Sequence, residues 1–330
     1  MRIGIVRLSA LGDITHSMIV LEFIKKHYPD SSIDWFVDKK FSKLLIGNNN
    51  INKLFELDIK NQVSSKKYLK FWRTLWGLKK LPKYDLVIDL QGLIKSAIVT
   101  RFINSKKTYG FSKKSIKESF ASNFYSSTFS IPYSENVIRR NLALVSFALQ
   151  KKFSELDILN KKSFLFYTNN KDIEKIDERF ILIVPFASFE SKVYPKEKYE
   201  EVTRLVDYRF LVLYGDDKEK VIAQEIKDGK QNVELIGSLN LNQLKNLVDK
   251  SDLVIGGDTG PVHIAWGLNK PSICLFGPTD PFRNFIKTKK NKFLCTGTPD
   301  DPYKIDKFSS SIRNIKVMEI VKMINSLISL

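Results

Sequence analysis

The segment Leu8–His16 carries the first side chains that could do chemistry, because it directly follows a strand-like apolar run. Small residues and a helix-like pattern surround Asp13, which is typical of a junction between a strand and a helix. A carboxylate at such a junction can act as a general base on a hydroxyl group. It can equally serve as a helix N-cap, and spacing alone favours the cap.

A second segment, Gly256–His263, also lies between an apolar run and a helical pattern. Pro261 suits the first turn of a helix. Thr259 and Gly260 would leave backbone N–H groups open to a phosphate, which the helix dipole also favours. His263 belongs to the same first turn. The segment therefore indicates a phosphate site, with an ordinary capped turn and a packed histidine as the alternative.

Two further loops follow apolar runs, namely Pro185–Lys192 and Gly277–Pro281. Lys192 is the cation of the first loop that is best placed to meet a phosphate. Taken alone, such a lysine is more typical of a solvated surface.

Several motifs are missing from the sequence. It contains no Asp-x-Asp, no His-Glu-x-x-His, no Cys-x-x-Cys and no Walker loop. Because these motifs are absent, we expect the protein to bind no metal ion and no cofactor. The charge of a departing diphosphate would then be met by Lys192 and by helix N-termini.

Short apolar runs alternate with helical patterns along the whole chain, which predicts an α/β fold with mainly parallel sheets. The expected strands are Arg2–Leu8, Ile33–Val37, Leu86–Asp89, Phe180–Phe186, Arg209–Tyr214, Val233–Ile236, Leu253–Ile255 and Ser272–Phe276. Residues 150–178 are polar and rich in Lys and Asn, which places a domain boundary there. Ile315–Ile328 is the pattern of a final amphipathic helix. Ligands of such domains are expected at the carboxyl ends of the strands.

Charge is distributed unevenly between the two halves. Residues 1–165 hold 29 Lys and Arg against 13 Asp and Glu, a net +16, whereas residues 166–330 hold 25 against 23. A basic half predicts an anionic partner such as nucleic acid, a membrane surface or an acidic substrate, although solvated lysines would give the same count. The chain has two cysteines, no apolar run of membrane-spanning length and no signal-peptide pattern, so a cytoplasmic location is expected.

One predicted helix, Lys66–Lys80, combines aromatic and basic residues. Its apolar side chains recur at helical spacing, and no Asp or Glu occurs between Ile59 and Tyr84. The apolar positions are Tyr68, Phe71, Trp72, Leu75 and Trp76. This composition is typical of a helix that lies in an anionic membrane interface. A surface helix that packs its aromatic rings on the sheet is the alternative.

Together these segments resemble glycosyltransferase family 9, and in particular its members that add the first heptose to the lipopolysaccharide core. The resemblance rests on Leu8–Asp13, Asp89–Ala97, Asp258–His263 and Gly277–Pro281, in that order along the chain.

The resemblance implies a GT-B architecture, in which two Rossmann-like domains face a cleft and a C-terminal helix crosses back. Residues 1–160 would bind the acceptor and 161–310 the nucleotide sugar, while 311–330 would pack on the first domain. The implied reaction is an inverting, metal-independent transfer of L-glycero-D-manno-heptose from ADP-heptose to a Kdo residue of Kdo2-lipid A, without a cofactor. The protein is then expected to be a monomer on the cytoplasmic face of the inner membrane.

The resemblance also assigns site residues. Asp13 matches the proposed base and Lys192 the phosphate-binding lysine. The implied donor site comprises Ser188, Lys192, Glu219, Asp258, Thr259, Gly260 and His263. Ala187 stands where the family tends to have a second hydroxyl residue, which argues against a phosphate contact from that position. The predicted acceptor residues are Ser9, Gly12, Gln91 and Lys95, with the basic residues Lys66, Lys67, Lys113, Lys114 and Lys117.

Two other functions fit parts of the pattern. An enzyme of the same fold could add the second heptose instead of the first. A basic nucleic-acid-binding protein would also explain the charge, but the basic residues form no recognisable recognition module, so no nucleic-acid partner is expected.

Overall fold

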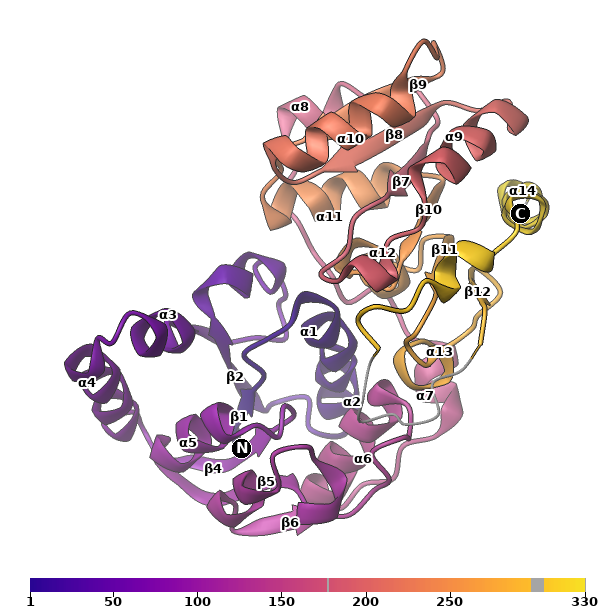
Figure 1. The fold of residues 1–330 in the computed structure, drawn as a ribbon. Helices are drawn as coiled ribbons and strands as arrows, with labels where there is room; N and C mark the ends of the chain where they lie inside the picture. The colour runs from indigo at the N-terminus through magenta and orange to yellow at the C-terminus, as the bar shows by residue number, and fades with distance from the viewer. Residues whose placement is uncertain (177, 298–305, 330) are drawn as a thin grey trace. The chain divides into compact units, whose positions relative to one another are not determined.

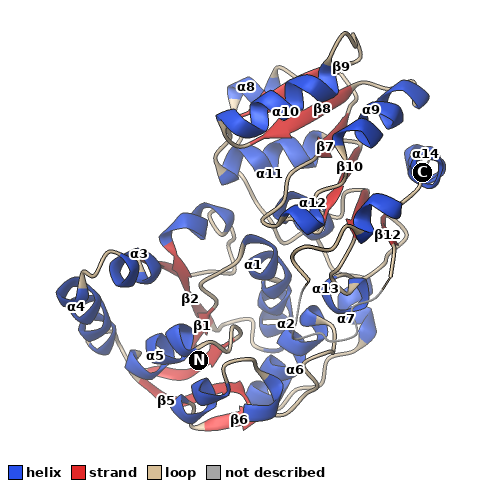
Figure 2. Ribbon diagram, viewed as in Figure 1, coloured by secondary structure: helices blue, strands red, loops and turns tan. Residues whose placement is uncertain are grey.

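The chain divides into two compact units, Met1–Phe164 and Leu165–Leu330. The computed structural model describes residues 1–330 apart from 177, 298–305 and 330 (Figure 1). Helices and strands alternate in both units, and Figure 2 shows the strands of each unit lying among helices. The predicted α/β class with two Rossmann-like domains is confirmed. The observed boundary between Phe164 and Leu165 lies close to the one that the sequence predicts between residues 160 and 161.

Unit 1 is built on a six-stranded sheet in which every neighbouring pair is parallel. Its strands are β1 (Arg2–Val6), β2 (Ser32–Asp38), β3 (Lys53–Leu57), β4 (Tyr84–Asp89), β5 (Ser105–Phe111) and β6 (Ser127–Phe129). The spatial order is β3-β2-β1-β4-β5-β6. The order of strands therefore reverses between β1 and β4, which is where open α/β sheets bind their ligands.

Helices cover both faces of this sheet. They are α1 (Leu11–Ser17), α2 (Ile19–His27), α3 (Ile59–Ser64), α4 (Tyr68–Lys79), α5 (Ile94–Phe102), α6 (Val137–Leu149) and α7 (Glu155–Leu159), with the 3-10 turns η1 (Lys39–Leu44), η2 (Lys113–Ser115) and η3 (Ser119–Phe124). α3, α4 and α5 pack next to one another, while α1 and α2 pack with α6. Because both faces are covered, β1 carries no polar side chain after Arg2, and Ile3, Ile5 and Val6 are fully buried.

The aromatic and basic helix of the sequence is α4, which begins at Tyr68. It buries only Leu75 and Leu78, and Trp72 and Trp76 remain half-exposed while their rings contact Phe102. The helix also contains Gly77, where an added Cβ would meet no atom within 4 Å. The rings are therefore neither fully packed on the sheet nor fully in solvent.

Unit 2 repeats the same topology. Its parallel strands are β7 (Ile181–Val184), β8 (Phe210–Tyr214), β9 (Val233–Gly237), β10 (Leu253–Gly257), β11 (Ser272–Phe276) and β12 (Asn291–Cys295). The spatial order is β12-β11-β10-β7-β8-β9, so the reversal falls between β7 and β10. Of the strands in the two units, β3, β5, β6 and β12 were not predicted from the sequence.

The helices of unit 2 are α8 (Lys171–Glu174), α9 (Lys196–Leu205), α10 (Asp217–Lys227), α11 (Leu241–Lys250), α12 (Gly260–Gly267), α13 (Pro281–Asn284) and α14 (Val317–Ile328), with the 3-10 turns η4 (Glu190–Lys192) and η5 (Ser311–Asn314). In α14, the apolar face packs on α9, β10 and β11, and Ile320 and Ile324 belong to the core of this unit. The sequence analysis expected residues 311–330 to pack on the N-terminal domain, and that contact stays a prediction. Among the described residues, every helix falls short of the length and apolar character needed to cross a bilayer.

Candidate functional site

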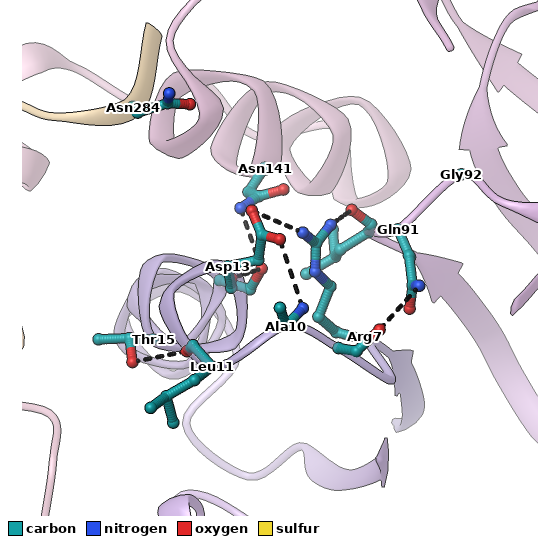
Figure 3. A network of polar contacts seen from close by, with 12 residues as sticks. Arg7, Ala10, Leu11, Asp13, Thr15, Gln91, Gly92, Asn141 and Asn284 are labelled. Atoms are coloured by element: carbon teal, nitrogen blue, oxygen red, sulfur yellow. Dashed lines mark hydrogen bonds and ion pairs between the residues drawn. The ribbon is translucent and has the colours of Figure 1, made fainter. Parts of the chain in front are cut away.

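Asp13 lies in the first turn of α1, directly after β1. Its Oδ2 accepts a hydrogen bond from the backbone N–H of Ala10 at 3.3 Å. Its Oδ1 lies 3.0 Å from a guanidinium nitrogen of Arg7, and Figure 3 shows the carboxylate between these two partners. The side chain of Asp13 remains 45% exposed. The N-cap interpretation is wrong, because Ala10 is the N-cap of α1 and Asp13, in the first turn, accepts from the N–H of Ala10 while its carboxylate still faces solvent.

Arg7 is a site residue that the sequence analysis missed. It ends the apolar run of β1, and its side chain is only 8% exposed. Its guanidinium also donates to the carbonyl oxygen of Leu90, just beyond β4. Arg7 therefore joins the ends of the two central strands to Asp13. A signal was present, since an arginine at the end of a buried strand must find a partner when the chain folds.

Gln91 and Ser9 connect the same two strand ends. The side-chain oxygen of Gln91 accepts from the backbone N–H of Leu8 at 2.8 Å, and its amide nitrogen lies 3.4 Å from Ser9 Oγ. Lys95 Nζ, from the first turn of α5, lies 3.4 Å from the same hydroxyl. Gly12 precedes Asp13 in α1. The structure thus brings Ser9, Gln91 and Lys95 of the predicted acceptor set to the strand ends that also carry Asp13.

Asp89 shapes the loop that carries Gln91. It is fully buried and accepts hydrogen bonds from the backbone N–H of Gln91 at 2.8 Å and from the hydroxyl of Tyr125 at 2.8 Å. Burial raises the pKa of Asp89 despite these bonds. Gly92 follows with φ +70°, and a Cβ there would lie 2.6 Å from Ile116. The loop therefore needs glycine at this turn.

The basic residues predicted to meet the acceptor lie elsewhere on unit 1. Lys66 and Lys67 are exposed between α3 and α4. Lys113 and Lys114 are exposed in η2, and exposed Lys117 lies 5.5 Å from the ring of Tyr133. Because η2 follows β5, its lysines share the carboxyl edge of the sheet with Asp13.

In unit 2 the corresponding strand ends carry Lys192 and Asp258. Lys192 Nζ lies 2.6 Å from Asp258 Oδ2, and His263 Nε2 lies 2.9 Å from Asp258 Oδ1. The side chains of Lys192 and Asp258 are only 12% and 7% exposed. Burial alone would raise the pKa of Asp258, but the charge of Lys192 and the hydrogen bond from His263 hold it well below its usual range. Asp258 is therefore an anion that fixes a cation.

Glycine explains how Lys192 reaches this position. A Cβ on Gly257, at the end of β10, would lie 2.2 Å from the carbonyl oxygen of Lys192. A Cβ on Gly277, just beyond β11, would lie 2.9 Å from the carbonyl oxygen of Ser191. The η4 turn can thus pass directly over the ends of both strands only because these positions have no side chain.

The N-terminus of α12 lies next to this ion pair in the chain. Thr259 is the N-cap residue, its side chain makes no capping hydrogen bond, and Pro261 occupies the first turn. The first N–H groups of a helix have no partner inside the helix, so those after Thr259 can donate to an anion. The structure thus places Asp258, Thr259, Gly260 and His263 of the predicted donor set together with Lys192.

Ser188 and Glu219 follow the carboxyl ends of β7 and β8, respectively. Ser188 is exposed in the loop after β7. Glu219 lies in the first turn of α10, and its Oε2 accepts from the backbone N–H of Gly215 at 2.6 Å, just after β8. Thr279, in the loop after β11, is a residue that the sequence analysis did not select. Its buried hydroxyl has no hydrogen-bond partner within the described residues.

The described residues contain no cluster of three or more His, Cys, Asp or Glu side chains arranged to hold a metal ion. Unit 1 presents an oriented carboxylate that can accept a proton, and unit 2 presents a cation and a helix N-terminus that can receive an anion.

Comparison with known proteins adds the family relation. The profile of "Glycosyltransferase family 9 (heptosyltransferase)" matches residues 69–304. The chain is 39% identical to lipopolysaccharide heptosyltransferase 1 of Campylobacter coli, with 99% of each chain covered. It is 25% identical to lipopolysaccharide heptosyltransferase 1 of Escherichia coli K12, over 85% of this chain and 89% of that one.

Solved structures show the same fold. The E. coli heptosyltransferase WaaC with ADP superposes with a TM-score of 0.80 at 20% identity, covering 99% of this chain and 100% of the other. E. coli ADP-heptose lps heptosyltransferase II gives a TM-score of 0.75 at 19% identity, covering 100% and 99%. At these identities the likeness supports the GT-B fold.

Proposed function

The chain belongs to glycosyltransferase family 9 and is a heptosyltransferase of lipopolysaccharide core biosynthesis, and we propose that it transfers a heptose from ADP-heptose to a Kdo residue of Kdo2-lipid A. The acceptor assignment is supported by the 39% identity to a heptosyltransferase 1 over 99% of both chains. The reaction chemistry depends on one structural observation above all. Asp13 is a solvent-facing carboxylate held in place by a buried arginine.

In this proposal Asp13 acts as the general base. The Kdo hydroxyl attacks the anomeric carbon of the heptose, the bond to the diphosphate breaks, and the hydroxyl proton passes to Asp13. Attack from the face opposite the leaving group inverts the anomeric centre. The ion pair with Arg7 and the bond from Ala10 N–H fix the carboxylate, so little orientation remains to be lost in the transition state. Ser9, Gln91 and Lys95 would bind the acceptor sugar beside it.

Unit 2 would bind the donor and stabilise the charge that appears on ADP. Lys192 is held next to the N-terminus of α12 by Asp258, so a cation and free N–H groups can meet the same diphosphate. Such preorganised donors are most effective when negative charge develops on the leaving group. We propose that this arrangement makes the transfer independent of a metal ion, in line with the missing Asp-x-Asp motif. Ser188 and Glu219 would contact the rest of the nucleotide sugar.

The lipid acceptor would be met on the cytoplasmic face of the inner membrane, by a peripherally bound monomer. Support comes from the excess of basic residues in unit 1 and from α4, whose Leu69 is 90% exposed among Lys66, Lys67, Lys70 and Arg73. An exposed apolar side chain flanked by cations suits an anionic interface.

The test is a transfer assay with two acceptors, Kdo2-lipid A and the same lipid already carrying one heptose. We expect transfer to the first and little to the second, and the reverse result would assign addition of the second heptose. ADP-heptose should be used in preference to UDP- and GDP-sugars. An arm containing EDTA should keep its activity, and loss that Mg²⁺ restores would contradict metal independence.

A further inference from the structure

A hollow on unit 1 lies far along the sheet from Asp13. It has a volume of about 630 Å³ and is formed where α5 ends, β5 begins and η3 ends. Four cations line it, namely Lys79, Arg101, Lys106 and Lys107. We call this hollow the basic basin. Because it lies at the start of β5, it belongs to the amino edge of the sheet, whereas Asp13 follows the carboxyl end of β1. The basin is therefore not part of the proposed catalytic site.

The charge of the basin is almost uncompensated. No Asp or Glu is among the residues that line it. Lys106 Nζ lies 2.6 Å from Asp85 Oδ1, outside the basin. For Lys79, Arg101 and Lys107, no ion pair with a described residue is recorded. Cations gathered without acids on a surface create a local positive potential, which favours an anion in the hollow between them.

Aromatic rings border the basin on two sides. On one side, the ammonium group of Lys79 lies 4.9 Å from the ring of Trp76 and 5.2 Å from that of Phe102, which lines the basin. On the other side, Phe124 lines the basin and packs edge-to-face on Phe120, which is 61% exposed. Half-exposed rings around cations are typical of proteins that sit at the boundary between lipid headgroups and hydrocarbon.

The basin continues into the exposed face of α4. Trp76 and Trp72 both contact Phe102, and Trp72, Tyr68 and Leu69 are 50%, 54% and 90% exposed. An aliphatic side chain that is almost completely exposed gains nothing from a polyanion such as nucleic acid, but it gains burial in a bilayer. The surface thus combines a row of apolar side chains with a cationic hollow at its end.

We propose that the basic basin binds the phosphate headgroup of an anionic phospholipid while the exposed side chains of α4 enter the membrane interface. This inference rests on the proposed function in one respect, namely that the acceptor is carried by a membrane. Lys79 stabilises the bound phosphate together with Arg101 and Lys107. The bound headgroup would lie at the C-terminal end of α4, next to Lys79. The opposite end of the helix, near Lys66, lies toward the carboxyl edge of the sheet, which carries Asp13.

The experiment removes two cations of the basin and compares them with two cations elsewhere on the same unit. The test variant is Arg101→Gln with Lys107→Gln, and the matched control is Lys151→Gln with Lys152→Gln. All four side chains are exposed, and both variants lose two charges. Binding to phosphatidylcholine vesicles, with and without phosphatidylglycerol, is measured by co-sedimentation at low and moderate salt.

We expect the basin variant to bind phosphatidylglycerol vesicles about 25-fold more weakly, at about fivefold for each cation near the surface, and the control to bind nearly as the wild type does. Equal losses of vesicle affinity in both variants would show that only the total charge matters, and would overturn the proposal. Unchanged vesicle binding of the basin variant would overturn it as well. Weakened binding to duplex DNA without any binding to vesicles would assign the surface to nucleic acid instead.

Transfer to a soluble acceptor sugar without lipid separates this inference from the proposed function. The basin variant should transfer to the soluble sugar at the wild-type rate and to vesicle-borne acceptor with a raised KM. A wild-type protein that transfers to neither acceptor would contradict the proposed function, while the vesicle measurement would still decide the role of the basin.

Discussion

The two units place an ion pair at the same point of the same topology, but only the pair in unit 1 has an exposed partner. In unit 1 the pair Arg7 and Asp13 lies at the reversal between β1 and β4, with the arginine 8% and the carboxylate 45% exposed. In unit 2 the pair Lys192 and Asp258 lies at the reversal between β7 and β10, with exposures of 12% and 7%. In unit 1 a buried arginine positions an exposed carboxylate, whereas both members of the pair in unit 2 are largely buried.

The difference indicates how one fold can supply two kinds of chemistry. In unit 1 the buried cation orients an exposed carboxylate that can take a proton, and in unit 2 the buried carboxylate holds a cation that can meet a phosphate. Lys192 and Asp258 follow different strands, β7 and β10, whereas Arg7 and Asp13 both follow β1. Each of the following predictions tests whether the pairs divide the work in this way.

The largest effect is expected for Asp13→Asn. The amide oxygen can still accept from Ala10 N–H, so the start of α1 is kept, but the side chain can no longer accept the acceptor proton. We expect kcat to fall by about 10²–10⁴, with ADP binding by calorimetry unchanged. A near-normal kcat would leave Asp13 with the role of a helix cap alone.

A second loss of rate is expected for Lys192→Met, because the charge that meets the leaving diphosphate is removed. The fall in kcat should be about 10²–10³. Lys192→Met alone also leaves Asp258 as a buried anion without its lysine partner, which would destabilise the fold. The double variant Lys192→Met with Asp258→Asn is therefore the control for folding. Stability should recover in the double variant while activity does not. Recovered activity would show that Lys192 serves the fold and not the reaction.

Stability should distinguish the two carboxylates. Asp258→Asn leaves Lys192 buried without its anion, which costs about 3–5 kcal/mol when a buried pair is broken. Asp13→Asn should cost about 1 kcal/mol or less, since that side chain is already partly hydrated and Arg7 keeps its bond to Leu90. Denaturant unfolding of the two variants measures the difference. Equal losses of unfolding free energy in the two variants would contradict the proposed difference between the two ion pairs.

Acid should affect the units in opposite directions. The pKa of Asp258 is lowered in the folded state, so its contribution to stability is present above the unfolded value of about 3.9 and is lost as pH falls below it. The pKa of Asp89 is raised by burial, so its contribution is present below that value and is lost as pH rises through the folded pKa. Hydrogen exchange of peptides from β10 and β4, measured near pH 3 and at neutral pH, should show this divergence. Asp258→Asn should flatten the dependence in unit 2 only.

Much of the fold could be predicted from apolar runs, because strands buried on both faces carry a strong hydrophobic pattern. The strands that escaped prediction lack that pattern. β5 contains exposed Lys106 and Lys107, and β3 begins with exposed Lys53, so alternation is hidden by charge. The packing of α14 on its own unit also followed from no local pattern, since an amphipathic helix does not specify which surface covers it.

The site was predictable where glycine and helix starts mark the ends of strands, as at Asp13 and Asp258. The partner of Lys192 was not predictable, because Lys192 and Asp258 follow separate strands and meet only when those strands align. The basic residues chosen for the acceptor show the limit of charge alone. Lys95 reaches Ser9, but Lys66 and Lys67 lie at the start of α4, and Lys113 lies in η2.

Gly77 has a consequence for the motions of unit 1. A glycine in the interior of a helix costs about 1 kcal/mol relative to alanine, and here the space around it offers no steric reason for that cost. α4 buries two residues, whereas α6 buries nine, so little packing opposes fraying of α4. Local opening of α4 should therefore require far less free energy than global unfolding. The helix that carries Trp72 and Trp76 can then reshape itself on a surface while the sheet beneath it stays folded.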